Sequence, residues 1–208
     1  AGIPPLREVI MEKLSRENGL PGTAENVVVT AGACEALILC LMAATDPGDE
    51  VIIPDPCWSN YMGEIHTAGG KAVPARTYKE DRFHLKASTV KSLLTEKTKV
   101  LFLNTPSNPT GAVLDMADLK EIAALAVEHD LTVVSDEPYE KLVYDGRRHV
   151  SIGSLPGMAE RTLTVNSFSK AFAMTGWRVG YVHGPEEVVA AMVKLHESFS
   201  SCVNSAAQ

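Results

Sequence analysis

The sequence lacks the patterns that mark several classes of protein. No apolar run approaches the roughly 20 residues that a membrane-spanning helix needs. The six histidines form no HxxxH or HExxH pattern, which argues against a metal site. The formal net charge is −7, and this acidic balance argues against a nucleic-acid-binding protein. We therefore expect no metal, no nucleic-acid partner and no membrane partner.

Cysteine pairing is also missing. The four cysteines, at positions 34, 40, 57 and 202, show no CxxC motif and no paired spacing. This is typical of free thiols in a reducing compartment, so we expect a cytoplasmic location. The chain opens on AGIPPLREVI, without an initiator methionine or a signal-peptide pattern. This opening predicts that the chain is an internal part of a longer protein.

The sequence does contain a regular alternation of short β-branched runs and longer helical patterns. The chain has 208 residues, 45% of them apolar, which suits one large domain with a sizeable core. Apolar stripes predict helices over 5–18, 116–129 and 186–199, the second behind an N-cap candidate at Asp115. The strand candidates are 27–30, 50–54, 71–75, 99–104, 131–136, 162–167 and 178–183. This alternation predicts an α/β fold: a three-layer α/β/α sandwich around a seven-stranded, mostly parallel sheet.

The last two predicted strands are joined by a short link. Only residues 171–177 lie between the end of one strand region, at Lys170, and the start of the next, at Arg178. A parallel crossover needs about a dozen or more residues, so we expect the last strand to run antiparallel to its predecessor. Its first residue, Arg178, then lies at the sheet edge where the other strands end.

Ligands of open α/β sheets bind outside the carboxyl ends of the strands. Reading those ends in turn gives AGACEAL, DPCWSNY, TPSNPTG, SDEPY and NSFSK, to which the antiparallel strand adds Arg178. Each stretch alone has an ordinary structural explanation, such as a turn, a helix cap or a solvated lysine. Their joint occurrence at one edge indicates a binding site.

The chemistry of these groups points to one ligand. An amine that forms an imine suits a carbonyl compound. An arginine, hydroxyls and a helix N-terminus suit a phosphate dianion. A carboxylate suits a protonated ring nitrogen, and an indole suits a flat ring. Together these demands describe pyridoxal 5′-phosphate.

The motifs SNPTG, SDEPY and SFSKAFAMTGWRVGY, in this order and spacing, resemble those of fold-type I pyridoxal-phosphate enzymes. The resemblance is to class I aminotransferases of the aspartate and aromatic type, and it covers essentially the whole chain. It implies that Lys170 holds the cofactor as an imine and later moves the substrate proton. It also implies that Asp136 pairs with the pyridinium nitrogen and that Tyr139 and Asn108 hydrogen-bond the ring 3′-oxygen.

The resemblance assigns the remaining contacts as well. Trp58 is expected to stack on the ring. The phosphate is expected to be bound by Ser167, Ser169 and Arg178 and by the backbone N–H groups of Gly32, Ala33 and Cys34. The family often has polar side chains in that last turn, whereas Ala33 offers only its backbone and Cys34 is at best a weak donor.

The resemblance also sets expectations about the whole protein. Residues 1–208 match the cofactor-binding large domain, and the family's N-terminal arm and C-terminal small domain are expected to lie outside this chain. The implied activity is amino transfer between an amino acid and a 2-oxo acid in a homodimer. A carbon–sulfur β-lyase of the same fold and a non-catalytic sensor domain remain alternatives. A dinucleotide-binding domain is disfavoured, because no GxGxxG follows the first strand.

Overall fold

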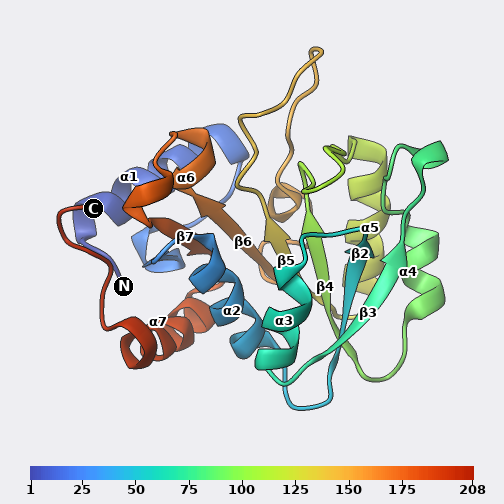
Figure 1. Ribbon diagram of the computed structural model, residues 1–208, viewed down its shortest axis with the longest axis horizontal. Helices are drawn as coiled ribbons and strands as arrows, with labels where there is room; N and C mark the ends of the chain where they lie inside the picture. Colours follow the sequence, from blue (N-terminus) through green and yellow to red (C-terminus); the bar gives the residue numbers. More distant parts are fainter.

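The computed structural model describes residues 1–208 (Figure 1). Its strands are β1 (Val27–Thr30), β2 (Glu50–Asp55), β3 (Lys71–Arg76), β4 (Thr98–Asn104), β5 (Thr132–Asp136), β6 (Thr162–Ser167) and β7 (Gly180–His183). Its α-helices are α1 (Pro4–Lys13), α2 (Ala33–Ala44), α3 (Asn60–Thr67), α4 (Ala87–Leu93), α5 (Met116–Glu128), α6 (Phe168–Ala171) and α7 (Glu186–Ser200). The shorter elements are η1 (Leu14–Asn18), η2 (Ala24–Asn26), η3 (Lys79–Asp81), η4 (Ile152–Ser154) and η5 (Thr175–Trp177).

All strands form one sheet in the order β1-β7-β6-β5-β4-β2-β3. Strand β7 pairs antiparallel with both β1 and β6, and every other pair is parallel. The seven-stranded sheet and its single antiparallel strand are therefore confirmed. The carboxyl ends of the parallel strands and the start of β7 share one edge, which is the upper edge in Figure 1.

Alternate residues of the strands pack into cores on opposite faces of the sheet. On β5, Val134 joins the core beneath α2, α3 and α7, while Val133 joins the core beneath α4 and α5. A third cluster packs α1 and η1 against β1 and β7. Figure 1 shows α2 and α3 in front of the sheet and α5 behind it. This arrangement confirms the three-layer sandwich and places the last residue of β5, Asp136, on the α2 and α3 face.

The predicted helices differ from the observed ones mainly at the N-terminal end of the chain. The stretch predicted as one helix over 5–18 is α1 followed by the π-helical η1. Val9, one of the apolar residues in the range predicted as a helix, is 61% exposed, while Ile10 and Leu14 are buried. Val9 lies in the regular helix α1, about 100° around the helix axis from Ile10, and so falls outside the side that packs on β1 and β7. Asp115 caps α5 as predicted, accepting from the N–H groups of residues 117 and 118.

The last strand begins later than its apolar run indicates. Arg178 lies in the left-handed region with φ 56° and ends the 3-10 turn η5, so β7 starts only at Gly180. The chain reverses between β6 and β7 through α6 and η5, and Arg178 stands at the end of this reversal. Arg178 therefore belongs to a turn and not to the strand.

Gly180 allows the start of β7 to approach the N-terminus of α2. A Cβ atom at Gly180 would lie 2.6 Å from the carbonyl carbon of Gly32 and 2.8 Å from the nitrogen of Ala33, and both are backbone atoms. We expect Gly180→Ala to cost about 1–3 kcal/mol of unfolding free energy, because backbone must move to admit the methyl group. Urea titration should show this loss. Gly176→Ala is the matched control, because its Cβ would meet no atom within 4 Å. Equal midpoints for the two variants would contradict the expected clash.

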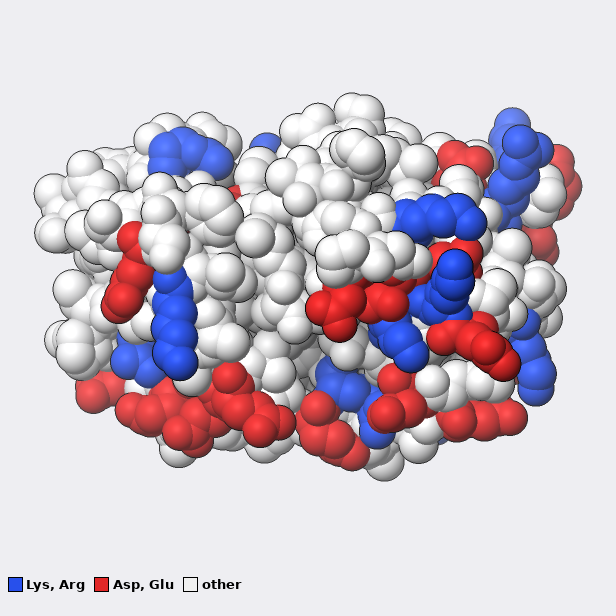
Figure 2. Space-filling view, turned by 90° about the horizontal axis from the view of Figure 1, so that it is seen from below, with Lys and Arg blue, Asp and Glu red and all other residues white.

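The face opposite the site edge carries mixed charge. Figure 2, which views the molecule from below, shows lysine and arginine side chains interspersed with aspartate and glutamate. None of the helices has both the length and the apolar character needed to cross a membrane.

Candidate active site

A cavity of about 230 Å³ opens at the sheet edge where the parallel strands end. Its lining comes from segments far apart in the sequence: the start of α2, the β2–α3 connection, the ends of β4 and β5, α6 and the turn before β7. Of the residues predicted for the site, nine line this cavity: Ala33, Cys34, Trp58, Asn108, Asp136, Tyr139, Ser169, Lys170 and Arg178. Gly32 and Ser167 were also predicted, and they are not among the lining residues.

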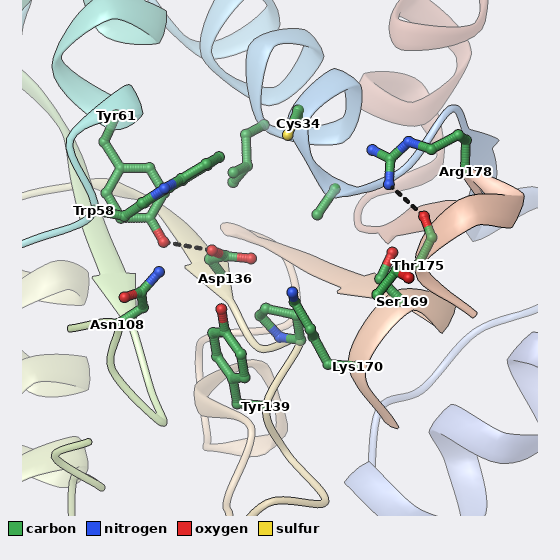
Figure 3. A pocket seen from close by; sticks show the side chains of 13 residues that line it. Cys34, Trp58, Tyr61, Asn108, Asp136, Tyr139, Ser169, Lys170, Thr175 and Arg178 are labelled. Carbon is green, nitrogen blue, oxygen red and sulfur yellow. Dashed lines mark hydrogen bonds between the residues drawn. The ribbon is translucent and has the colours of Figure 1, made fainter. Parts of the chain in front are cut away.

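Asp136 occupies the centre of the site (Figure 3). Asp136 is the last residue of β5, and it is only 4% exposed. Burial raises the pKa of Asp136 to about 7; the hydrogen bond from Tyr61 opposes the rise, and the charge of Glu137 adds to it. One carboxyl oxygen, Oδ1, is buried and has no hydrogen-bond partner. A buried carboxylate with a free oxygen is suited to a ligand that brings a cationic N–H group.

Tyr61 holds the other oxygen of Asp136 and is a site residue that the sequence reading missed. Its hydroxyl donates to Asp136 Oδ2 over 2.5 Å. The ring also contacts Trp58 edge-on, with centroids 5.4 Å apart, and Phe102, at 4.4 Å. Tyr61 lies in the first turn of α3, three residues after Trp58, which belongs to the β2–α3 connection, so neighbouring segments supply the two aromatic rings. That spacing from a predicted site residue is the one signal that could have identified it.

Lys170 lies on α6, a single helical turn that begins directly at the end of β6. The side chain of Ser167 caps this turn by accepting from the N–H of Ser169 over 3.0 Å. Ser167 therefore shapes the segment that presents Lys170 instead of lining the cavity. Figure 3 shows the Lys170 amine reaching toward Asp136, with Tyr139 beside it.

The opposite end of the cavity is suited to an anion. α2 begins here behind Gly32, which has φ 85°, and the N–H groups of its first turn face this end of the site. The Arg178 guanidinium lies so close to Gly32 that a Cβ there would fall 2.5 Å from Nη2. Arg178 also donates from Nη1 to the carbonyl of Thr175 over 3.0 Å, which fixes its direction (Figure 3). The positive end of the α2 dipole and the Arg178 guanidinium therefore both favour a negatively charged group at this end of the cavity.

Tyr139 and Asn108 complete the side of the site near β4 and β5. Burial raises the pKa of Tyr139, the nearby charge of Asp136 adds to the rise, and the side chain of Asn108 opposes it. Asn108 follows β4, and its backbone N–H donates to the Asn104 side chain over 2.7 Å. That same Asn104 donates to the Asp136 carbonyl over 3.0 Å. The loop carrying Asn108 is therefore tied to the strand that carries Asp136.

Comparison with known proteins places the chain in a family. The family model for aminotransferase class I and II matches residues 1–208. The aspartate aminotransferase of Pyrococcus abyssi is 48% identical over 202 residues, which are 97% of this chain and 52% of that protein. The aspartate/prephenate aminotransferase of Thermus thermophilus is 47% identical over 208 residues, 100% of this chain and 53% of that protein.

Solved structures support the same family assignment. The structure of Thermus thermophilus aspartate aminotransferase with maleate superposes with a TM-score of 0.97 at 47% identity, covering 100% of this chain and 54% of that one. The chain spans about half the length of the curated relatives it matches. The chain belongs to the class I and II aminotransferase family.

Proposed function

We propose that this chain is the cofactor-binding part of a pyridoxal-phosphate-dependent aminotransferase, which moves an amino group from an amino acid to a 2-oxo acid. The observation that carries the proposal is the free, buried Oδ1 of Asp136 in a cavity that also holds an amine and an anion site. An uncompensated buried carboxylate is costly without a partner. A protonated pyridine nitrogen would satisfy that oxygen.

The other lining groups fit the remaining parts of the same molecule. Lys170 would hold the cofactor covalently through its Nζ atom, and Arg178, Ser169 and the start of α2 would bind the phosphate. Trp58 would cover one face of the ring, and Tyr139 and Asn108 would bind its oxygen substituent. Ser167 and Gly32, which the sequence reading assigned to the phosphate, would contribute through the backbone they shape.

Proton movement would be carried out by Lys170. When bound, the cofactor supplies an electron sink that acidifies the substrate Cα–H bond. Lys170 Nζ, freed by the incoming amino group, would take that proton from Cα and return it two atoms away, to the carbon on the other side of the nitrogen that is transferred. Asp136 would keep the ring nitrogen protonated, because the pairing favours the ionised carboxylate over its neutral form. Tyr61 would support this state by donating to Asp136.

The relatives suggest what the whole protein acts on. Those named above carry the names aspartate and aspartate/prephenate aminotransferase, so we propose an amino donor and 2-oxo acid acceptor of that class. We propose a homodimer with residues 1–208 as the large domain of a longer enzyme, in which an N-terminal arm and a small domain complete the substrate site. All four cysteines are free thiols, which supports a reducing compartment such as the cytoplasm.

Two measurements test the proposal. The chain mixed with pyridoxal phosphate should develop the absorbance of lysine-bound cofactor, and no such band would count against it. The longer enzyme, given a panel of amino acids, should form the matching oxo acid and pyridoxamine phosphate in equal amounts. Release of pyruvate and ammonia would instead indicate the carbon–sulfur β-lyase. Cofactor binding without turnover of any amino acid would indicate the sensor domain.

A further inference from the structure

Tyr139 lies between two buried carboxylates that the proposed chemistry does not use. Glu137 is 0% exposed and Glu140 is 8% exposed. Pro138 and Tyr139, between them, line the cavity, whereas neither glutamate does. Asp136 faces the α2 and α3 side of the sheet, so the next residue, Glu137, is directed to the other side. The cavity wall is thus backed by charged groups.

Glu137 ties the end of β5 to the loop that returns toward β6. Its Oε1 accepts from the Ser135 hydroxyl over 2.7 Å. Its Oε2 lies 2.7 Å from His149 Nε2 and accepts from the Ser151 hydroxyl over 2.5 Å. The loop between these two anchor points is the long one that rises above the sheet in Figure 1. Glu137 therefore closes the base of the loop that starts with Tyr139.

Glu140 ties the same segment to the N-terminal part of the chain. It forms an ion pair with Lys13 at the end of α1 and accepts from Asn18 Nδ2 over 2.7 Å. Asn18 also donates to Ser151 over 2.8 Å, which joins the Glu137 and Glu140 contacts into one network. The backbone on both sides of Tyr139 is consequently anchored by carboxylates that are fixed at several points.

The charges around this network balance. Burial alone would lower the pKa of His149, but the charge and hydrogen bond of Glu137, with the charge of Glu140, raise it above its ordinary value. Lys13 opposes that rise. From β7, Tyr181 and His183 also face these carboxylates, and Glu17 lies near Tyr181. Glu137, Glu140 and His149 offer ligand atoms within 4.8 Å of one another. The protein's own groups already bind both carboxylates, so the network needs no metal.

We propose that Glu137, Glu140 and His149 are positioning residues, which fix Tyr139 from behind and balance the charge next to Asp136. The proposal deepens the function proposed above, on which it rests for the role of Asp136 and Tyr139. Glu137 is bonded to Asp136 in the chain, and its charge makes Asp136 harder to ionise. His149, 2.7 Å from Glu137, offsets that charge. The two members of the pair should therefore act on Asp136 with opposite sign.

The opposite effects of Glu137 and His149 on the ionisation of Asp136 can be measured without any cofactor. The ionisation midpoint of Asp136 can be followed by carboxyl-carbon NMR in the cofactor-free chain. Asp136→Asn distinguishes its signal from that of Glu64 on α3, whose pKa burial and the charge of Asp136 also raise to about 7. Glu137→Gln removes a negative neighbour and should lower the midpoint, on the order of one pH unit. His149→Gln leaves the Glu137 charge uncompensated and should raise the midpoint. Glu140→Gln, a second variant, should lower it by less than Glu137→Gln does.

A matched control separates charge balance from loosened packing. His84 and Asp118 form another buried pair, with Nδ1 2.5 Å from Oδ2, and neither residue lines the cavity. His84→Gln should destabilise the chain yet leave the Asp136 midpoint unchanged. Shifts of the same sign in Glu137→Gln and His149→Gln, or an equal shift in His84→Gln, would overturn the proposal.

The affinity for pyridoxal phosphate, measured as a function of pH, tests the proposed aminotransferase function separately from the positioning roles. The acid limb of binding should move with the Asp136 midpoint, downward in Glu137→Gln and upward in His149→Gln. Wild-type chain that fails to bind the cofactor would reject the proposed function and leave the NMR result to decide the positioning roles. Wild-type chain that binds, with midpoints that do not separate, would reject the positioning roles alone.

Discussion

Lys170→Ala is expected to abolish the covalent attachment of pyridoxal phosphate. Borohydride reduction of the loaded wild-type chain should leave one cofactor-sized mass on the peptide that contains Lys170, and the variant should show none. In the longer enzyme, turnover should fall by about 10²–10⁴-fold from the loss of proton transfer alone. The cavity would still contain Asp136 and Arg178, so the variant should retain cofactor non-covalently.

Lys141→Ala provides the control for this experiment. Lys141 is an exposed lysine whose amine pairs with Glu17 over 2.6 Å, outside the cavity lining. Its removal should leave the trapped adduct in place, since its exposed ion pair contributes little. An adduct that survives Lys170→Ala, or that disappears in Lys141→Ala, would show that the attachment site is misassigned.

Asp136→Asn is expected to stabilise the cofactor-free chain at alkaline pH. The pKa of Asp136 rises from 3.8 to about 7, so the folded chain holds this proton more tightly than the unfolded chain does. Stability from this group is therefore fully present at low pH, is lost as pH rises from about 4 to about 7, and stays lost above that. The loss is on the order of 4 kcal/mol for this fully buried group, and the variant should not show it.

Urea unfolding of both chains at several pH values checks the sign. The variant should be more stable than wild type at pH 8, with the difference shrinking toward zero near pH 4. With pyridoxal phosphate present the order should reverse, because asparagine cannot form an ion pair with a ring cation and only wild type gains strongly from binding. A cofactor-free variant that is less stable than wild type at pH 8 would contradict the high pKa.

The sequence predicts which residues meet at the edge of the sheet better than it predicts the backbone conformation of the segments that carry them. Lys170, Asp136 and Arg178 could be assigned to one place because buried strands and a short link determine which ends meet. The left-handed turn at Arg178 could not be foreseen, because an apolar run carries no information about where a strand's hydrogen bonding begins. The exposure of Val9 could not be foreseen, because Val9 adjoins Ile10 at the margin of the apolar stripe of α1, and only packing against β1 and β7 decides which side of that stripe is buried.

Supporting residues were also beyond the sequence reading. Tyr61 reads as an ordinary core residue of α3, and only its contact with Asp136, across the sheet-to-helix interface, gives it a role. Ser167 has the right chemistry for phosphate, yet helix capping accounts for its hydroxyl. His149 and Glu137 are twelve residues apart and meet only because a loop folds back. Such pairings depend on tertiary structure that local patterns do not encode.

The pairing of β7 with β1 has a consequence for how the protein is made. Gly32 and Arg178 come from opposite ends of the chain, and they meet only when β7 has inserted beside β1. Closing so long a loop costs entropy that no local contact offsets, so we expect this step to come late in folding. We expect β2 to β5 to form earlier in a chain emerging from the ribosome, whereas the proposed phosphate site needs Arg178 and so cannot be complete until most of these residues have been synthesised. Cofactor capture would then report that folding of this domain is finished.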